Sequence, residues 1–481
     1  MTQAAPTQTR TFGFLLNGEW LSEGTPVQVR APADQSVIAR VVQPGRSHVE
    51  AAIAASVKAF EVTRKLGAYE RQRVLRVISE GIASRREEFA RTLAMEAGKP
   101  IKTARVEVDR AVFTFSVAAE ESTRIYGEWL PLDVQAATAG RWAIVRRFPI
   151  GPIATITPFN FPLNLVAHKW APAIAAGCTV IHKPAPQTPL CSLLLAELVQ
   201  QAGWPAGGLN VLPVSVADAE PMVTDDRVKM LSFTGSAAVG WELKKRAGKK
   251  RVTLELGGNG SVIIHGDADL DYAAERCTMG GFSYAGQTCI SVQRVFVERR
   301  AVEKFLAAFV PRIKKLKLGD PLDETTDVGP MISEGAARRA EIWIEEAVTA
   351  GATLLCGGKR EGAMIEPTVL TGTRPEQRVN CEEVFAPVVT VEPYDDFAEA
   401  LRRVNDSPYG LQAGVFTRDA KLMFTAFEEL AVGGVMAGDV PTFRIDHMPY
   451  GGVKDSGLGR EGLRYAIEEM TERKILAVNL G

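Results

Sequence analysis

The chain has 481 residues, of which 46% are hydrophobic and 23% charged, with 56 Lys and Arg against 57 Asp and Glu. A single hydrophobic core stops growing at roughly 250–300 residues, so this length predicts at least two packed units. The formal charge of -1, without a basic cluster, argues against nucleic acid as a partner. No run approaches the roughly 18 apolar residues of a membrane span, and the N-terminus does not resemble a signal peptide, so we expect a cytoplasmic protein without a membrane partner.

The cysteines and histidines favour neither a disulfide framework nor a metal site. The six cysteines are far apart and include no CxxC pair, which predicts reduced thiols. None of the five histidines lies in an HExxH motif or beside paired cysteines. We therefore predict no metal.

The chain begins with helical patterns and then changes to strands. Ser47-x-x-Glu50 matches a capping box before a helix, and Tyr69–Phe89 repeats apolar residues at three- and four-residue steps. Aromatic residues, prolines and a turn over Arg124–Arg147 predict a pair of antiparallel strands that leave the body, and Lys474–Leu480 also has the pattern of a strand. Because exposed strand edges pair with other chains, we expect a homodimer or homotetramer.

From Trp142 onward, short apolar runs alternate with helical patterns, which predicts βαβ units around a buried parallel sheet. Ligands bind such sheets outside the carboxyl ends of the strands. The predicted strands are Ile153–Thr157, Thr179–His182, Leu209–Leu212 and Lys229–Phe233, with a helix over Cys191–Ala202.

A second strand-rich region follows and predicts a second α/β unit. Its expected strands are Val252–Leu256 and Ser261–Ile264, and its expected helices are Asp269–Met279, Val302–Leu316 and Glu334–Thr349.

Cys289, in Gly286-Gln-Thr-Cys289, is a candidate nucleophile. It precedes the β-prone run Val292–Val297, at a junction where a side chain can face a cleft. A lone cysteine is commonly inert packing, but the neighbouring Gly, Gln and Thr are polar where a core position would be apolar.

Glu255 and Asn160 each allow a structural and a functional interpretation. Glu255, in Thr253-Leu-Glu255-Leu-Gly-Gly-Asn259, forms either an ion pair or a general base that deprotonates a water or a thiol. Asn160, in Thr157-Pro-Phe-Asn160-Phe-Pro, either makes a turn or donates a hydrogen bond to an oxyanion.

Gly235 and Ser236 follow a predicted strand and begin a helix whose free backbone N–H groups can receive a phosphate. The motif is neither GxGxxG nor a P-loop, since Trp241 stands where the P-loop has its lysine. By itself it is a weak indication.

These four motifs occur in one order with Lys183-Pro, Glu383-Val-Phe385-Ala-Pro and Pro449-Tyr-Gly-Gly-Val-Lys-Asp-Ser-Gly-Leu-Gly-Arg-Glu461. In this combination the chain resembles the aldehyde dehydrogenase superfamily, in its hydrolytic, NAD(P)-dependent branch, from about Phe12 to the C-terminus. The resemblance implies an α/β fold with a Rossmann-like cofactor domain, an α/β catalytic domain and a small β oligomerisation arm. The implied boundaries are residues 1–123 and 146–251 for the cofactor domain, 252–440 for the catalytic domain, 124–145 and 470–481 for the arm, and 441–469 for a segment that returns to the cofactor domain.

The resemblance also implies oxidation of an aldehyde to a carboxylic acid. Cys289 would attack the aldehyde carbon to form a thiohemiacetal, while Asn160 and the Cys289 backbone N–H hold the oxyanion during hydride transfer. Glu255 would activate the water that hydrolyses the resulting thioester, and Lys169 would support that proton transfer.

For NAD or NADP, the resemblance assigns Lys183 to the adenine ribose, Gly235 and Ser236 to the pyrophosphate, and Glu383 and Phe385 to the nicotinamide ribose and ring. The other expected cofactor contacts are Ile156, Thr157, Val239 and Leu256.

Pro186 departs from the pattern of many NAD-preferring members, which have a glutamate there that bonds the ribose hydroxyls and repels a 2′-phosphate. Proline offers neither interaction, so the choice between NAD and NADP stays open.

The implied substrate tunnel contains Phe161, Asn164, His168 and Ser283. These neighbours predict a small polar aldehyde, either a hydroxyaldehyde such as lactaldehyde or glycolaldehyde, or a semialdehyde. The arginine that succinic semialdehyde dehydrogenases place before their nucleophile is replaced by Ser283, which disfavours that particular substrate.

Arg444 falls where members of the family often place substrate anchors. It either clamps a carboxylate or phosphate or pairs with Asp446 or another neighbour. The ion pair is the simpler interpretation.

Two other functions are compatible with the sequence. A CoA-acylating semialdehyde dehydrogenase is disfavoured by Glu255, which that branch typically lacks. A catalytically silent cofactor-binding protein is disfavoured by the intact set Asn160, Glu255 and Cys289.

Overall fold

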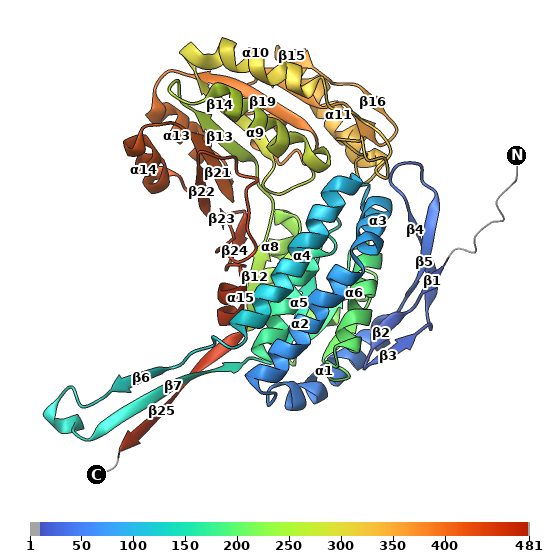
Figure 1. The fold of residues 1–481 in the computed structure, drawn as a ribbon, viewed down its shortest axis with the longest axis vertical. Helices are drawn as coiled ribbons and strands as arrows, with labels where there is room; N and C mark the ends of the chain where they lie inside the picture. The colour runs from blue at the N-terminus through green and yellow to red at the C-terminus, as the bar shows by residue number, and fades with distance from the viewer. Residues whose placement is uncertain (1–9, 480–481) are drawn as a thin grey trace, which may run out of the picture.

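The computed structural model describes residues 10–479; residues 1–9 and 480–481, and with them Leu480 of the last predicted strand, lie outside it. Figure 1 shows two lobes, one above the other, and an arm of long strands that leaves the lower lobe. No helix within residues 10–479 is long and apolar enough to cross a membrane.

An eight-stranded sheet forms the centre of the first lobe, in the order β24-β12-β11-β8-β9-β10-β2-β3. The five strands from β12 to β10 in this order run parallel, and the strands at both edges run antiparallel to their neighbours. Its strands are β2 (Phe14–Leu16), β3 (Glu19–Leu21), β8 (Pro152–Ile156), β9 (Thr179–Lys183), β10 (Leu209–Val211), β11 (Met230–Thr234), β12 (Arg251–Glu255) and β24 (Gly457–Leu458).

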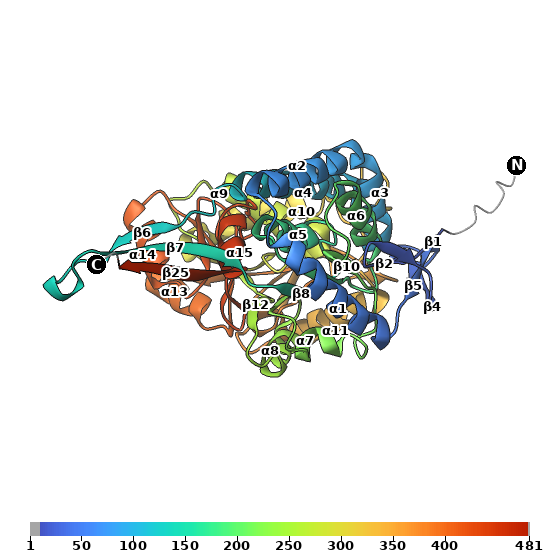
Figure 2. The same cartoon turned by 90° about the horizontal axis from the view of Figure 1, so that it is seen from below.

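Helices cover this sheet, and α5 is buried at every position because α2 and α4 pack over it (Figure 2). Apolar residues of these helices and of β8 to β10 form the first core. The helices of this lobe are α1 (Arg46–Thr63), α2 (Ala68–Ser84), α3 (Arg86–Ala97), α4 (Ile101–Glu121), α5 (Asn164–Ala176), α6 (Leu190–Gln201), α7 (Glu220–Thr224), α8 (Ala237–Arg246) and α15 (Leu463–Glu469).

A seven-stranded sheet forms the second lobe, in the order β15-β18-β19-β14-β13-β21-β22, and all its strands except β15 run parallel to their neighbours. The strands are β13 (Gly260–Ile264), β14 (Val292–Glu298), β15 (Thr353–Cys356), β18 (Thr368–Thr371), β19 (Val388–Tyr394), β21 (Gln412–Phe416) and β22 (Gly434–Ala437). The helices are α9 (Leu270–Phe282), α10 (Val302–Ile313), α11 (Glu334–Thr349), α12 (Arg378–Cys381), α13 (Phe397–Asn405) and α14 (Ala420–Glu429).

The arm consists of β6 (Glu128–Pro131), β7 (Arg141–Pro149) and β25 (Thr471–Asn479), with β7 between the other two and antiparallel to both. The smaller sheets are built from β1 (Thr11–Phe12), β4 (Thr25–Arg30) and β5 (Val37–Gln43), from β16 (Arg360–Glu361) and β17 (Met364–Ile365), and from β20 (Tyr409–Gly410) and β23 (Val453–Lys454).

The α/β fold that the resemblance implies is confirmed, but three local expectations need correction. The strand expected to open the second unit, Val252–Leu256, corresponds to β12, which pairs with β11 in the first sheet. The expected helix Tyr69–Phe89 is two helices, because the backbone of Arg85 leaves the helical region at φ −105° and ψ 23°. Ser47 is not a cap, since α1 begins at Arg46. The remaining domain boundaries stay predictions.

Candidate active site

A cavity of about 410 Å³ receives residues from the carboxyl ends of β8, β11 and β12 and from loops of the second lobe. Parallel sheets bind ligands at this position. The predicted site residues that line it are Asn160, Phe161, Asn164, His168, Gly235, Ser236, Glu255, Leu256, Ser283, Cys289, Glu383, Phe385 and Arg444. The others, Ile156, Thr157, Lys169, Lys183 and Val239, are not part of its lining.

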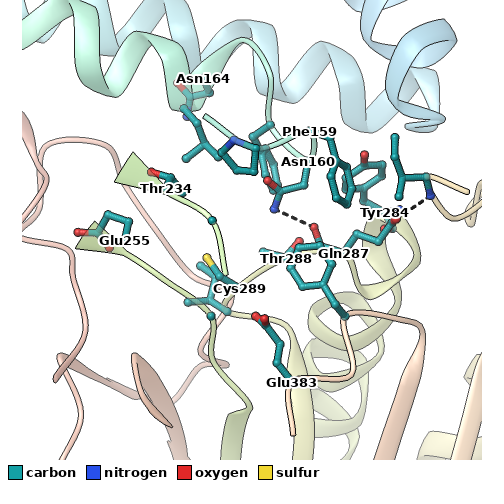
Figure 3. A pocket seen from close by; sticks show the side chains of 18 of the residues that line it. Phe159, Asn160, Asn164, Thr234, Glu255, Tyr284, Gln287, Thr288, Cys289 and Glu383 are labelled. Carbon is teal, nitrogen blue, oxygen red and sulfur yellow. Dashed lines mark hydrogen bonds between the residues drawn. The ribbon is translucent and has the colours of Figure 1, made fainter. Parts of the chain in front are cut away.

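A strained loop presents Cys289 to the cavity. Tyr284 and Ala285 have φ angles of 50° and 52°, in the left-handed region that side chains rarely adopt. Gly286 also has a positive φ, and a Cβ there would meet the Ala386 oxygen at 2.2 Å, so this position requires glycine. Figure 3 shows the Cys289 sulfur between the strand that carries Glu255 and the loop that carries Glu383.

Within the described part of the chain, the thiol of Cys289 has one hydrogen-bond partner, the hydroxyl of Tyr450, 3.0 Å from Sγ. Burial raises the pKa of this thiol to about 11. A thiolate therefore needs a base or a hydrogen-bond donor nearby to form at neutral pH.

Asn160 lies in the loop after β8, and its Nδ2 donates to the backbone oxygen of Gln287 at 3.0 Å (Figure 3). Gln287 in turn accepts a hydrogen bond at Oε1 from the Ile332 N–H at 2.8 Å. The amide of Asn160 is thus fixed beside the loop that carries Cys289. Nδ2 has two hydrogens, so one of them remains to bond an oxygen in the cavity.

Glu255 ends β12 as a buried carboxylate, and neither of its oxygens has a hydrogen-bond partner among the described residues. Burial and the nearby Glu461 raise its pKa well above the usual value. A buried carboxyl group without a partner in a cavity is a strong candidate for a proton acceptor.

Lys169 is connected to the site through Glu461. Its Nζ lies 3.2 Å from Glu461 Oε1 and donates to Ser232 Oγ at 2.9 Å. Burial opposes ionisation of Glu461, but Lys169 and His168 hold its pKa well below the usual range. The carboxylate of Glu461 also accepts a hydrogen bond from Arg444 Nη2 at 3.0 Å.

Arg444 therefore pairs with Glu461, while Asp446 has other partners: His168 Nε2 at 2.7 Å and Arg110 Nη2 at 2.6 Å. Arg444 Nε is buried and has no partner among the described residues. Both Arg110 and Arg444 line the cavity, and each guanidinium is paired with a buried carboxylate, Asp446 or Glu461.

The residues expected to hold a dinucleotide fit that group. Gly235 and Ser236 precede α8, whose first turn has no side-chain cap, and the buried Thr234 Oγ1 has no partner among the described residues. Glu383 Oε1 accepts from the Gly258 N–H at 3.0 Å, and burial raises the pKa of Glu383 to about 7.

The remaining cofactor residues lie around this region. Among residues 10–479, the ammonium of the buried Lys183 has one hydrogen-bond contact, at 3.5 Å to the Pro184 oxygen, so it can turn to a ligand. Pro186 is exposed, Val239 is 48% exposed on α8, and Ile156 ends β8, followed by Thr157. No cluster of three or more metal-ligating side chains occurs within residues 10–479.

Comparisons with known proteins agree with this geometry. Residues 20–476 match the model of the aldehyde dehydrogenase family. The 3-sulfolactaldehyde dehydrogenase of Priestia aryabhattai is 44% identical over 98% of this chain and 99% of its own. Aldehyde dehydrogenase 21 from Physcomitrella patens, in complex with the reaction product succinate, superposes with a TM-score of 0.97 at 47% identity, over 99% of this chain and 100% of its own. Glyceraldehyde-3-phosphate dehydrogenase from Methanocaldococcus jannaschii, complexed with NADP, superposes with a TM-score of 0.92 at 40% identity, over 95% of this chain and 100% of its own.

The chain belongs to the aldehyde dehydrogenase family. The predicted family and enzyme class, an NAD(P)-dependent oxidoreductase, are confirmed, and the preference between the two cofactors stays open.

Sequence reasoning missed several residues that the structure brings to the site. Tyr450 and Glu461 lie in a motif that supported the family resemblance, but nothing in the sequence showed their contacts. Gln287 lies in the motif of Cys289 but had no assigned role, and Arg110 and Lys99 carried no signal, because the partners of all three are far away along the chain.

Proposed function

We propose that this protein oxidises a small aldehyde that carries an anionic group, with or without a hydroxyl, to the carboxylic acid. The observation that carries the proposal is the buried Nε of Arg444, which has no partner among the described residues and belongs to a side chain that lines the cavity with Cys289. A guanidinium donor without a partner is well suited to a carboxylate, sulfonate or phosphate oxygen. Arg110, which is paired with Asp446, adds a second guanidinium group to the lining of the same cavity.

The relatives support this substrate class. One similar protein is named for a sulfonated hydroxyaldehyde and another for a phosphorylated hydroxyaldehyde, and a third is described in complex with its product succinate. All three compounds are short and carry an anionic group. The succinate complex argues for keeping succinic semialdehyde among the substrates to be tested, although Ser283 disfavours it.

In this proposal Cys289 attacks the aldehyde carbon, and the thiol proton passes to Glu255 or to water. Asn160 Nδ2 and the Cys289 backbone N–H stabilise the oxygen of the thiohemiacetal. NAD(P), held by Lys183, Ser236 and Glu383, would supply the hydride acceptor with which the thiohemiacetal on Cys289 becomes a thioester.

Glu255 then takes a proton from the attacking water, and the buried pair of Lys169 and Glu461 supports this proton transfer through its charges near Glu255. A buried base with a raised pKa and no competing partner supports hydrolysis over transfer to coenzyme A. A CoA-acylating enzyme would require coenzyme A for turnover in the experiment below, and a silent cofactor-binding protein would show no turnover.

The experiment compares kcat/KM for 3-sulfolactaldehyde, succinic semialdehyde, lactaldehyde and hexanal, with NAD and NADP, with and without coenzyme A. We expect an anionic aldehyde to be preferred, and Arg444→Met to lower its kcat/KM by about 10- to 100-fold more than that of lactaldehyde, because a hydrogen bond to a charged group is lost. Arg110→Met provides a second variant in which Glu461 keeps its partners.

Four outcomes would overturn parts of the proposal. Equal losses for lactaldehyde and the anionic aldehydes in both arginine variants would remove the anion-binding role. Strict dependence on coenzyme A would overturn the role of Glu255. Turnover by the Cys289→Ala variant would overturn the assignment of Cys289 as the nucleophile. A wild-type protein that turns over none of the aldehydes would overturn the proposed activity.

We also propose that the protein forms a homo-oligomer through the arm. Trp129, Ile475 and Leu476 expose 65%, 55% and 62% of their surface there, as expected for a contact between subunits. The predicted cytoplasmic location stays a prediction.

A further inference from the structure

Tyr450 contacts the sulfur of Cys289, and its surroundings leave its hydroxyl proton available to that sulfur. Its side chain is 3% exposed and packs with Ile290 and Leu411 beside Cys289. Its hydroxyl lies 3.0 Å from Cys289 Sγ and has no other hydrogen-bond partner among the described residues. Nothing in this part of the chain competes for the hydroxyl proton.

The position of this hydroxyl is fixed by the backbone. The backbone N–H of Tyr450 donates to the backbone oxygen of Glu461 at 3.1 Å, and the backbone N–H of Glu461 donates to the backbone oxygen of Tyr450 at 2.7 Å. The same backbone bridge therefore places the phenol beside Cys289 and the Glu461 carboxylate beside Lys169 and Arg444. A donor held in this way needs no reorganisation when charge develops on the sulfur.

Arg444 strengthens the phenol as a donor. Its guanidinium carbon lies 3.5 Å above the centre of the Tyr450 ring. A cation over an aromatic face is attracted to the ring electrons, and this withdraws electron density from the hydroxyl. The side chain proposed to bind the substrate anion thus also contacts the group that touches the nucleophile.

We propose that Tyr450 is a further catalytic residue, which donates a hydrogen bond from its hydroxyl to Cys289 Sγ and stabilises the thiolate that attacks the aldehyde. A thiolate can only accept a hydrogen bond, so in the reactive state the phenol must be the donor. The thiol proton leaves to Glu255 or water, and Tyr450 keeps its own proton. Burial raises the pKa of Tyr450 well above its usual value, which keeps the hydroxyl protonated.

The proposal rests on the proposed function only in taking Cys289 as the nucleophile. It is tested without aldehyde or cofactor, by the rate at which iodoacetamide alkylates Cys289 over a range of pH. The rate is followed by mass spectrometry on the Cys289 peptide, because Cys356 and Cys381 are also partly exposed. Failure of the substrate proposal would leave this experiment unaffected.

Tyr450→Phe removes the hydroxyl and keeps the ring beneath Arg444. We expect the midpoint of alkylation to rise by about one pH unit, with about tenfold slower alkylation below the midpoint and the same plateau at high pH. The matched control is Tyr394→Phe, a buried tyrosine in the second lobe whose hydroxyl contacts His265 at 3.1 Å, and it should leave the midpoint unchanged.

A second variant keeps the test decisive if Tyr450→Phe perturbs the fold. A fluorinated tyrosine at position 450 is a stronger hydrogen-bond donor, so it should lower the midpoint. An unchanged midpoint in Tyr450→Phe, or shifts in the same direction for both variants, would overturn the proposal. A lower plateau with an unchanged midpoint would also overturn it, because it would report access to the thiol rather than its ionisation.

Discussion

Lys99 Nζ lies 2.8 Å from the backbone oxygen of Asn160, so a buried lysine supports the loop that carries the proposed oxyanion donor. The same ammonium pairs with Glu107 and lies 3.6 Å from the ring centre of Phe161. Glu107 in turn accepts the backbone N–H of Leu163 at 3.0 Å, just before α5. One buried ion pair therefore connects α4 to the middle and to the end of the loop between β8 and α5.

We predict that Lys99→Met lowers the free energy of unfolding by about 3–5 kcal/mol, because Glu107 would be left as an unpaired buried charge. It should also lower kcat more than it changes KM. Lys102→Met is the matched control, since Lys102 is 44% exposed and pairs with Asp327 at the surface, a contact worth about 1 kcal/mol or less. Urea denaturation gives the two values, and similar values for both variants would contradict the interpretation.

Glu96 predicts a pH dependence of stability. This buried carboxyl group on α3 accepts the backbone N–H groups of Leu190 and Cys191 at 2.8 and 3.0 Å, at the start of α6, and burial raises its pKa from 4.5 to about 7. Between these pH values the unfolded chain has lost the proton that the native protein still holds. Stability attributable to Glu96 is therefore complete below pH 4.5 and falls as pH rises to about 7, by up to about 3 kcal/mol.

Glu96→Gln should remove this decline, so the difference in unfolding free energy between wild type and variant changes between about pH 4.5 and pH 7. Glu88→Gln, on the same helix, is the control. The neighbouring Arg85 lowers the pKa of Glu88, so the stability that this carboxylate contributes is lost as pH falls and not as pH rises. Urea denaturation at several pH values measures both. A difference that stays constant across this range for Glu96→Gln would contradict the prediction.

Much of the site was predictable because its residues directly follow predicted strands. Asn160 follows β8, Ser236 follows β11, and Glu255 ends β12; these three strands are neighbours in the parallel part of the sheet, so its carboxyl edge brings the residues together. Local pattern placed these residues, whereas their roles came from the family resemblance, because each motif alone was ambiguous.

Contacts between distant segments were not predictable in the same way. The sequence suggested Asp446 for Arg444 because it is nearby in the chain, whereas the backbone bridge at Tyr450 brings Glu461 to Arg444 instead. Likewise, the apolar pattern of residues 252–256 predicts a strand, but the sheet to which this strand, β12, belongs is decided by its pairing with β11. Both outcomes depend on tertiary packing.

The proposed base can be isolated kinetically. Glu255→Gln keeps the size of the side chain and removes the proton acceptor, so acylation of Cys289 should proceed while hydrolysis slows by about 10²- to 10⁴-fold. Rapid mixing should show one reduced cofactor per active site, followed by almost no turnover. Loss of both the burst and the steady state would instead assign Glu255 to activation of the thiol.

Cofactor preference can be changed at Pro186, which is exposed and therefore tolerant of substitution. We predict that Pro186→Glu lowers kcat/KM for NADP at least about tenfold relative to NAD, because the carboxylate repels a 2′-phosphate and bonds ribose hydroxyls. Gln187→Glu adds the same charge at the next exposed position and is the control. An equal effect of both variants on the two cofactors would indicate a general electrostatic change.

The arm gives the last prediction. Leu476 of β25 is 62% exposed although β25 is fully paired with β7, so the apolar surface is available to another subunit. Leu476→Asp should place a charge in that contact and lower the mass measured by sedimentation, without unfolding the lobes. Val216→Asp is the control, because Val216 is 82% exposed and lies in the loop between β10 and α7, far from the arm in the chain. If Leu476→Asp leaves the mass unchanged, the subunits associate through another surface.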